Sequence, residues 1–255
     1  MSTIRLDTGS ASMADYGLPA DALDVSFFIP CYNEEPNVIG AIEKLVEVSN
    51  KLGLSYEILV FDDCSRDGTV ATVQAYQAAH PLVPIRLFVN ETNRGVARNF
   101  FEAAFHARGR YYRLVCGDDV EPLESHEQLL RHIGQADIIV PYFTAIKGRP
   151  YRRHLISRLY TFLVNCASGY RLRYYNGCPI YRRLDVLRFH VETTGFGYQA
   201  EFLTRLIYEN RSFIEVPLTS IDREGSGSVN LRNGLSVAHS LLKIALRRLR
   251  VYLYE

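Results

Sequence analysis

Short apolar segments alternate with helical patterns through the first 143 residues, and this alternation is the feature that most restricts the fold. We predict strands where the apolar residues are β-branched or aromatic, and helices where apolar residues recur every three or four positions. The predicted strands cover 25–30, 56–63, 85–90, 111–116 and 136–143, and the predicted helices cover 36–52, 68–79, a segment through Phe100 to Ala107, and 123–133. Apolar strands separated by helices are typical of a parallel sheet covered on both faces. We therefore predict an α/β protein with a mostly parallel sheet flanked by helices.

The pattern changes after residue 143. Segment 151–168 has helical spacing with arginines beside a Leu/Phe/Val surface, and 169–183 is rich in Tyr and Arg and is predicted to be loop and strand. A glycine-rich turn leads into a helix over 195–211 that carries Glu201. A strand over 213–218, a loop over 220–233 and a closing helix over 235–254 complete the chain.

Polar residues gather directly after four consecutive predicted strands. These segments read CYNEEPN, DDCSRDGT, NETNRGVARN and CGDDVEP. In a parallel sheet the carboxyl ends of the strands meet at one edge, where ligands bind. Helix caps and turns account for single residues such as Asn33 and Asp67, but a cap needs one acceptor. The adjacent pairs Asp62–Asp63 and Asp118–Asp119 therefore indicate a ligand site at this edge.

Charge is spread unevenly although the net charge is only +1. No Asp or Glu occurs in 138–184, which holds nine Lys and Arg residues, and none occurs in 225–254, which holds five. On a helical wheel the closing helix is basic and amphipathic: Ser236, His239, Ser240, Lys243, Arg247 and Arg250 share one stripe, and its leucines lie elsewhere. Two alternatives remain open, contact with a membrane surface or packing of apolar faces on the sheet or on a second copy in a homodimer. Nucleic acid is disfavoured because the same chain presents an acidic rim.

Cysteine usage and the termini bear on location. The five cysteines are odd in number and have no CxxC spacing, which favours a reducing compartment over a disulfide framework. Residues 1–23 read as a polar, flexible arm without a signal-peptide pattern. No segment reaches the roughly 18 uninterrupted apolar residues of a membrane span. We expect a cytoplasmic protein that is peripheral on the cytoplasmic face of a membrane.

A set of motifs over about 25–228 resembles the family 2 inverting glycosyltransferases, closest to the branch that makes dolichyl- and polyprenyl-phosphate sugars. The motifs are FFIPCYNEE, EILVFDDCSRDGT, NRGVARN, VCGDDVEP, YNGCPIYRR, EFLTRLI and FIEVPLTSIDREGSGS. The resemblance implies a GT-A (Rossmann-like) domain over 24–230, with a nucleotide-sugar half over 24–122 and an acceptor half over 123–230. The amphipathic helix 231–255 would follow that domain.

By this resemblance the amino-terminal half binds a UDP- or GDP-sugar. Base and ribose would contact Pro30, Tyr32, Glu34, Asp62 and Asp63. A carboxylate at a strand end accepts hydrogen bonds from a base N–H and from ribose hydroxyls. Arg94 and Arg98 either reach the diphosphate or pair with these acids, and the two readings are equally supported.

The chain departs from the family at its metal motif. The family's Asp-x-Asp holds Mg²⁺ or Mn²⁺ against the diphosphate, whereas this chain has Cys116, Gly117 and Asp118. A neutral thiol is a poor ligand for Mg²⁺, so we expect Asp118 to hold the metal. Asp119 assists or points to ribose or acceptor. Weak or dispensable metal binding stays open.

A second departure concerns the acceptor. Family members with a polyprenyl-phosphate acceptor commonly have Ser-Gly-Phe-Arg where this chain has Asn176-Gly177-Cys178-Pro179. Arginines left as phosphate partners are Arg173, Arg182, Arg183 and Arg223. A phosphate acceptor is already ionised and needs no general base, whereas a hydroxyl does. The candidate base is Glu201, with Asp118 or Asp119 behind it, although a first-turn helix acid explains Glu201 equally well.

The resemblance therefore predicts a hexosyltransferase that transfers a sugar with inversion to a polyprenyl phosphate. The alternatives are transfer to a saccharide or small-molecule hydroxyl, and a GT-A-like protein that binds nucleotide sugars without turnover. As a lesser hypothesis, Cys31, Cys64 and Cys116 surround the cleft as a soft-metal or redox site.

Overall fold

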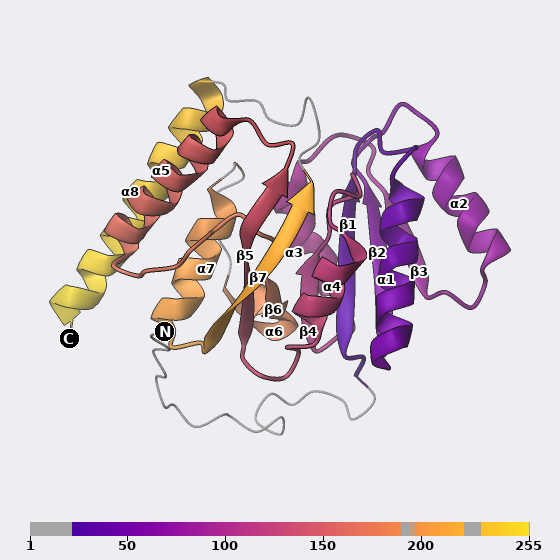
Figure 1. Cartoon of the computed structure of the whole chain (residues 1–255), viewed down its shortest axis with the longest axis horizontal. Helices are drawn as coiled ribbons and strands as arrows, with labels where there is room; N and C mark the ends of the chain where they lie inside the picture. Colours follow the sequence, from indigo (N-terminus) through magenta and orange to yellow (C-terminus); the bar gives the residue numbers. More distant parts are fainter. Residues whose placement is uncertain (1–21, 190–194, 196, 222–230, 255) are drawn as a thin grey trace.

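A computed structural model of the chain describes residues 22–189, 195, 197–221 and 231–254 (Figure 1). The predicted amino-terminal arm lies almost wholly outside these residues. The strands are β1 Val25–Cys31, β2 Tyr56–Asp62, β3 Ile85–Val89, β4 Tyr111–Leu114, β5 Ile138–Lys147, β6 Ile180–Arg182 and β7 Phe213–Ile221. The helices are α1 Val38–Leu52, α2 Thr69–Ala79, α3 Val96–His106, α4 Leu123–Leu130, α5 Tyr151–Ser168, α6 Arg183–Arg188, α7 Tyr198–Tyr208 and α8 Leu231–Tyr254.

The described strands form one seven-stranded sheet in the order β3-β2-β1-β4-β6-β5-β7. The first three strands and β4 run parallel, and β5 runs parallel to β7. Only β6 is antiparallel, and it separates β4 from β5. Because β4 and β5 are both antiparallel to β6, their carboxyl ends lie at the same edge of the sheet. The predicted mostly parallel α/β sheet is confirmed.

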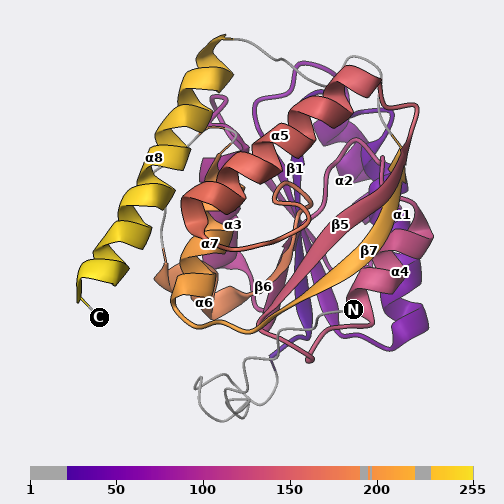
Figure 2. The same cartoon turned by 60° about the vertical axis from the view of Figure 1, so that its left-hand side comes forward.

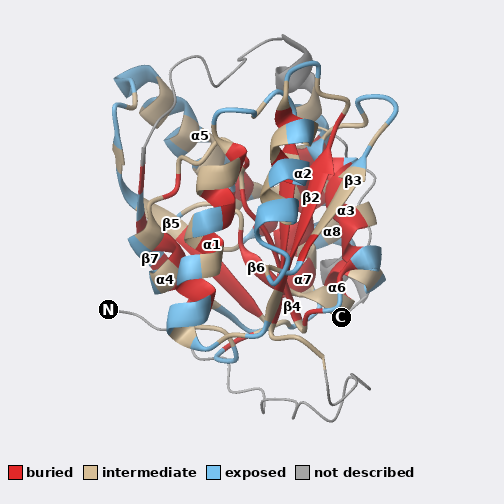
Figure 3. Cartoon of the chain, turned by 90° about the vertical axis from the view of Figure 1, so that its right-hand side faces the viewer, coloured by how far each residue is buried: buried red, intermediate tan, exposed pale blue. Residues whose placement is uncertain are grey.

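Helices cover both faces of the sheet, so the protein has three layers (Figures 1 and 2). One core cluster packs the sheet against α1, α2 and α4, and a second packs the other face against α3, α6 and α7. Buried residues concentrate along the strands between the helices (Figure 3). This burial on both faces is the reason that the strands are apolar throughout.

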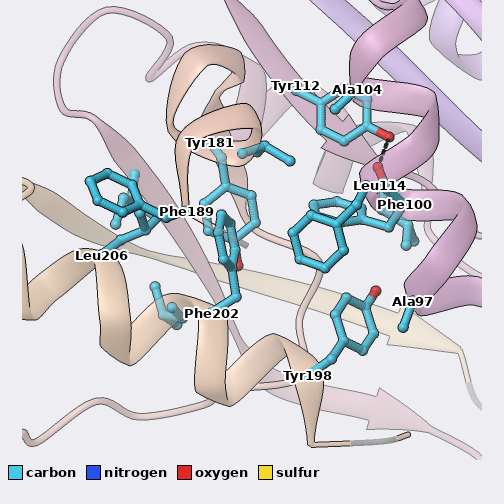
Figure 4. Close-up of a cluster of buried hydrophobic side chains, with 14 of the residues drawn as sticks. Ala97, Phe100, Ala104, Tyr112, Leu114, Tyr181, Phe189, Tyr198, Phe202 and Leu206 are labelled. Carbon is cyan, nitrogen blue, oxygen red and sulfur yellow. Dashed lines mark hydrogen bonds between the residues drawn. The ribbon is translucent and has the colours of Figure 1, made fainter. Parts of the chain in front are cut away.

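Aromatic rings fill the second cluster (Figure 4). Phe100 on α3 lies 5.1 Å from Tyr112 on β4 and 5.8 Å from Tyr198 on α7, measured between ring centroids. The buried Tyr112 hydroxyl donates to the Phe100 carbonyl at 2.8 Å. These contacts tie α3 and α7 to the middle of the sheet and fix the two halves of the chain to each other.

Helices α5 and α8 lie against each other at one side of the molecule (Figure 1). Helix α8 packs through Ser240 and Ile244, which are buried, and leaves Leu242, Leu246 and Leu249 exposed. These three leucines therefore do not pack on the sheet, whereas Leu241 packs against the core. No helix in the described part of the chain is long and apolar enough to cross a membrane.

Candidate active site

The carboxyl ends of β1, β2 and β4 meet at one edge of the sheet, as the sequence predicts. Cys31 is opposite Asp62 in the β1–β2 ladder, and the Asp63 amide donates to the Cys31 carbonyl at 2.8 Å. Beyond β4, Gly117 passes so close to β1 that an added Cβ would lie 3.0 Å from the Pro30 carbonyl oxygen. Such a contact would be tight, so glycine favours this close approach of the β4 loop to the end of β1.

Hydrogen bonds join the loop after β1 to the loop after β2. The Asn33 side chain accepts a hydrogen bond from the Arg66 amide at 2.8 Å, and the Asn33 amide donates to the hydroxyl of Ser65 at 2.9 Å. The Glu34 amide is 2.9 Å from the Thr69 hydroxyl oxygen. Asn33 therefore bridges two loops instead of capping a helix, which is a correction to its predicted role as a cap.

Four backbone positions on this rim adopt the left-handed conformation. Asn33, Cys64, Asp119 and Cys178 have φ angles of 58°, 68°, 58° and 52°. Side chains other than glycine seldom adopt this region, and such strain gathers at ligand sites.

Asp62 is the rim acid with an unused oxygen. Its side chain is 1% exposed, and its Oδ2 accepts from the Ser65 amide at 2.9 Å. Its Oδ1 is buried and has no hydrogen-bond partner among the described residues. A buried carboxylate oxygen is costly unless a donor meets it. The geometry therefore leaves Asp62 able to accept a hydrogen bond from a ligand.

Asp63 is instead used by the protein itself. Its carboxylate accepts from the amides of Arg94 and Gly95, both at 2.8 Å, and from the Asn90 side chain at 2.9 Å. Burial works to raise the pKa of Asp63, but these hydrogen bonds outweigh it and lower the pKa below its ordinary value. Asp63 thus shapes the loop that leads from β3 into α3.

The two arginines predicted near the diphosphate differ. Arg94 forms an ion pair with Glu102, at 2.6 Å between Nη2 and Oε2, so it pairs with an acid, though not with a rim aspartate. Arg98 is exposed on α3. Pro30 at the end of β1 is half-buried, and Tyr32 just beyond it is 47% exposed.

Asp118 and Asp119 have different surroundings. Asp119 turns toward α1, where its Oδ1 lies 2.9 Å from Lys44 Nζ. Lys44 also donates to the carbonyls of Asp119 and Glu121, at 3.4 and 3.3 Å. Lys44 therefore holds the loop that carries Asp118, and the Asp119 carboxylate anchors this loop to α1.

Beneath this loop lies a buried charged cluster that we did not predict. Arg113 on β4 is fully buried and donates to the Glu121 carboxylate and, at 2.8 Å, to Nδ1 of His126. Burial and then the charge of Arg113 hold the pKa of His126 well below its ordinary value. The sequence signal was an arginine inside an otherwise apolar strand, because such a residue needs a buried partner.

Cys116 contacts Cys178. A hydrogen bond with Cys178, followed by burial, raises the pKa of the Cys116 thiol well above its ordinary value, so the thiol stays protonated and is a poor ligand. No group of three or more His, Cys, Asp or Glu side chains in the described ranges could hold a metal ion, so Cys31, Cys64 and Cys116 do not form the predicted soft-metal site. The residues present fit Mg²⁺ or Mn²⁺ only with one protein carboxylate, Asp118, and the remaining ligands from a bound diphosphate and water.

The predicted acceptor-side residues are scattered. Glu201 is 2% exposed on α7, with its Oε1 3.7 Å from Arg247 of α8. Arg182 pairs with Asp137 at 2.6 Å, and Arg183 donates to the Gly109 carbonyl, both at the opposite edge of the sheet. The structure therefore does not bring these two arginines to the site. Arg223 lies outside the described residues.

The chain resembles known proteins over most of its length. Residues 26–191 match the family model described as glycosyl transferase family 2. A dolichyl-phosphate beta-glucosyltransferase of Dictyostelium discoideum is 24% identical over 93% of this chain and 79% of its own length. The succinoglycan biosynthesis protein ExoO of Rhizobium meliloti is 38% identical, over 45% of this chain and 30% of its own length.

Solved structures share the fold. Glucosyl-3-phosphoglycerate synthase from Mycobacterium tuberculosis, in complex with Mg²⁺ and uridine diphosphate, superposes with a TM-score of 0.67 at 15% identity. The match covers 88% of this chain and 79% of that one. At this identity the likeness concerns the fold, which is of the GT-A type.

Proposed function

The chain belongs to glycosyl transferase family 2, and we propose that it transfers a sugar, with inversion, from a UDP- or GDP-sugar to a polyprenyl phosphate at a membrane surface. Glycosyltransferase activity follows from the family. The donor site, the acceptor and the membrane contact are the proposal. It is supported by the strand-end rim on one side of the molecule and by the exposed face of α5 on the other.

The donor would bind at the carboxyl ends of β1, β2 and β4. Asp62 supports this assignment because its buried Oδ1 lacks a partner among the described residues, and a base N–H would supply one. Pro30 and Tyr32 would line the same pocket, with Glu34 and Asp63 holding its walls. Arg98, exposed on α3, is the better placed of the two arginines to meet the diphosphate, since Arg94 is paired with Glu102.

Asp118 is the residue that would hold a divalent cation beside the diphosphate. When bound, such an ion neutralises charge on the leaving nucleoside diphosphate. Lys44 and Arg113 hold the Asp118 loop from α1 and β4, so the carboxylate is positioned before the donor arrives. With one protein carboxylate, metal affinity should be weak in the absence of nucleotide.

The observation that carries the acceptor assignment is the exposed apolar stripe of α5. Tyr151, Leu155, Leu159 and Phe162 recur at helical spacing and are 81%, 57%, 55% and 61% exposed. This stripe lies in the acid-free part of the sequence, beside Arg152 and Arg158. An apolar stripe flanked by basic residues is typical of a helix that lies on an anionic membrane. A lipid-linked phosphate is the acceptor that such a surface would present.

A second candidate is a small, water-soluble acceptor. It is favoured by Pro179, which stands where polyprenyl-phosphate members of the family commonly have arginine, and by the likeness in fold to a synthase of glucosyl-3-phosphoglycerate. Transfer to a hydroxyl would need a general base. Glu201 is a weak candidate for this role because it is buried beneath α8 and paired with Arg247.

The test is a panel of UDP- and GDP-sugars, each incubated with and without Mn²⁺, using a short polyprenyl phosphate and 3-phosphoglycerate as alternative acceptors. We expect one donor to yield a lipid-linked sugar whose anomeric configuration, read by NMR, is opposite to that of the donor. Transfer only to 3-phosphoglycerate or another soluble acceptor would overturn the lipid assignment. Retention of configuration would overturn inversion.

A further inference from the structure

A pocket of about 570 Å³ opens between β5 and α5, apart from the rim that we assign to the donor. The last residues of β5 and the following loop form one wall of the pocket, and α5 forms a second wall. Arg173 and Tyr174 form the third wall. Tyr174 is held there by edge-to-face contact with Phe143, at 5.3 Å between ring centroids. The pocket is large enough for a phosphate group and the first part of an attached chain.

The lining of this pocket is basic. Arg149, His154, Arg158 and Arg173 line it, and none of the described residues that line it is Asp or Glu. Arg149 Nε is buried without a hydrogen-bond partner among the described residues. Arg173 is already engaged, because its guanidinium lies over the Tyr142 ring at 4.5 Å and reaches Glu215 at 4.0 Å. Within the part of the chain that the structure describes, Arg149 and Arg158 are therefore the lining arginines without an ion pair, and they face an anion-sized space.

The pocket adjoins the corner that holds Asp118. The carboxyl ends of β4 and β5 lie at the same edge of the sheet. The segment that closes the pocket at Tyr174 continues to Cys178, and Cys178 contacts Cys116, two residues before Asp118. Four residues span at most about 14 Å even when fully extended. An acceptor bound in the pocket is thus within one substrate length of the proposed donor site.

Helix α5 offers a path for a hydrocarbon chain out of the pocket. His154, Arg158, Thr161 and Asn165 face the pocket on one stripe of α5. The exposed Leu155 and Leu159 lie about 100° further around the helix, at 3.6 residues per turn, and the exposed Phe162 borders both this stripe and the pocket. A chain that leaves the pocket across α5 would meet this apolar stripe at once.

We propose that this pocket binds the phosphate of the acceptor, with Arg149 and Arg158 as the cationic partners of that phosphate. This proposal rests on the proposed function. The two guanidinium groups would replace the arginine that family members with this acceptor have at the position of Pro179. Arginine suits this task because its fixed fork donates two parallel hydrogen bonds to a phosphate. The prenyl chain would lie along the exposed stripe of α5.

The chemistry balances without a general base. A phosphate oxygen of the ionised acceptor forms the new bond to the anomeric carbon. The bond from that carbon to the diphosphate oxygen breaks, and its electron pair leaves with the nucleoside diphosphate. No proton has to be removed from the acceptor, which agrees with a pocket whose described lining holds cations and no carboxylate.

The test compares Arg149→Gln and Arg158→Gln with Arg152→Gln, which removes the same charge from the exposed side of α5 outside the pocket. Geranyl phosphate serves as a dispersed acceptor, so that membrane recruitment does not contribute. We expect each pocket variant to raise the acceptor KM about tenfold or more, the usual scale for a lost hydrogen bond to a charged group. Donor hydrolysis, donor KM and the melting temperature should stay unchanged, and Arg152→Gln should change the acceptor KM less than about twofold.

Inorganic phosphate at increasing concentration provides a second readout. It should compete with geranyl phosphate in the wild type and lose this effect in the Arg158→Gln variant, which should fold normally because the replaced side chain is exposed. Unchanged acceptor KM in both pocket variants would overturn the site while leaving the proposed function intact. If the wild type transfers to no prenyl phosphate, the proposed function itself fails.

Discussion

At the scale of single residues, Asp118 and Asp119 show how two adjacent acids can divide their work. Asp119 lies against α1 and pairs with Lys44, whereas we assign Asp118 to the donor diphosphate and its metal ion. Adjacent carboxylates repel each other, and the cation of Lys44 relieves that repulsion from one side. The pair therefore need not share one ligand.

We predict that Asp118→Asn lowers kcat about 100-fold or more, the usual loss when a group that stabilises developing charge is removed. Asp119→Asn should keep most of the activity and lower stability by about 1 kcal/mol, because its pair with Lys44 is partly exposed. Steady-state kinetics with thermal unfolding separates the two effects. Full activity in Asp118→Asn would show that the assignment is wrong.

His126 is a second residue with a testable role, through pH. Its pKa is held well below the ordinary value of about 6.5 by burial, by Arg113 and by Lys44. Glu121 lies 3.4 Å from the same ring nitrogen, but its carboxylate is already bound to Arg113. Below about pH 6.5 the unfolded chain therefore takes up a proton that the folded protein does not.

Stability should consequently fall as pH drops through this range, by up to about 1.4 kcal/mol per pH unit for this group. His126→Gln should remove that slope, since glutamine accepts from Arg113 without titrating. Chemical unfolding at several pH values between 5 and 7 measures the difference, with the exposed His239→Gln as the control. Parallel slopes for wild type and His126→Gln would contradict this account of the cluster.

At the scale of elements, α8 is the case in which the sequence pattern and the packing differ most. The polar stripe of its helical wheel includes Ser240 and Arg247, and these face α7 and the residue that caps it. Gly197, the N-cap of α7, allows the approach, because an added Cβ there would lie 2.0 Å from the Ser240 hydroxyl. The exposed leucines of α8 lie on the same side of the molecule as α5.

Replacement of Glu201 tests whether this residue anchors α8 or takes part in catalysis. If it anchors α8 through Arg247, as its burial indicates, Glu201→Gln should lower the melting temperature and keep at least about half of kcat. A general base would instead lose about 100-fold or more. Arg247→Gln should lower stability in the same way, which would attribute the effect to the Glu201–Arg247 ion pair. A large loss of kcat at unchanged melting temperature would assign Glu201 to the chemistry.

The exposed stripe of α5 makes a prediction about membranes. The double variant Leu155→Gln, Leu159→Gln should weaken binding to anionic vesicles about tenfold or more, because each leucine loses apolar burial worth about 1.5 kcal/mol or more. Folding should be unaffected, since both side chains are already exposed. Leu82→Gln, on a side chain that is 96% exposed far from α5, is the control. Equal vesicle binding by all three proteins would contradict the membrane contact.

At the scale of the whole molecule, the alternating strands and helices were predictable because each strand is buried on both faces. The strand-end rim followed from the same pattern. A strand was predicted within 169–183, but the bounds and antiparallel direction of β6 were not, since its three residues lie in a segment rich in Tyr and Arg without a clear period. The partners of Arg113, Asp63 and Arg94 were also hidden, because they lie on other elements and only the folded chain brings them together.

The arrangement of the whole molecule separates an acidic donor edge from a basic side around α5. The rim acids Asp62 and Asp118 lie at the ends of β2 and β4, whereas Arg149 and Arg158 belong to the β5–α5 side. This separation suits a reaction in which a charged donor from solution meets a phosphate presented by a lipid surface. It is also the basis on which the two substrates can be tested independently.

Formation of a lipid-linked sugar tests this account most directly. The protein would be incubated with its donor, Mn²⁺ and vesicles that contain a polyprenyl phosphate, and the lipid extract would be analysed by mass spectrometry. We predict a polyprenyl phosphate bearing one sugar residue, formed by the wild type and almost absent with Asp118→Asn. Turnover of the donor without any sugar on the lipid, under conditions in which the vesicles bind the protein, would contradict the central claim.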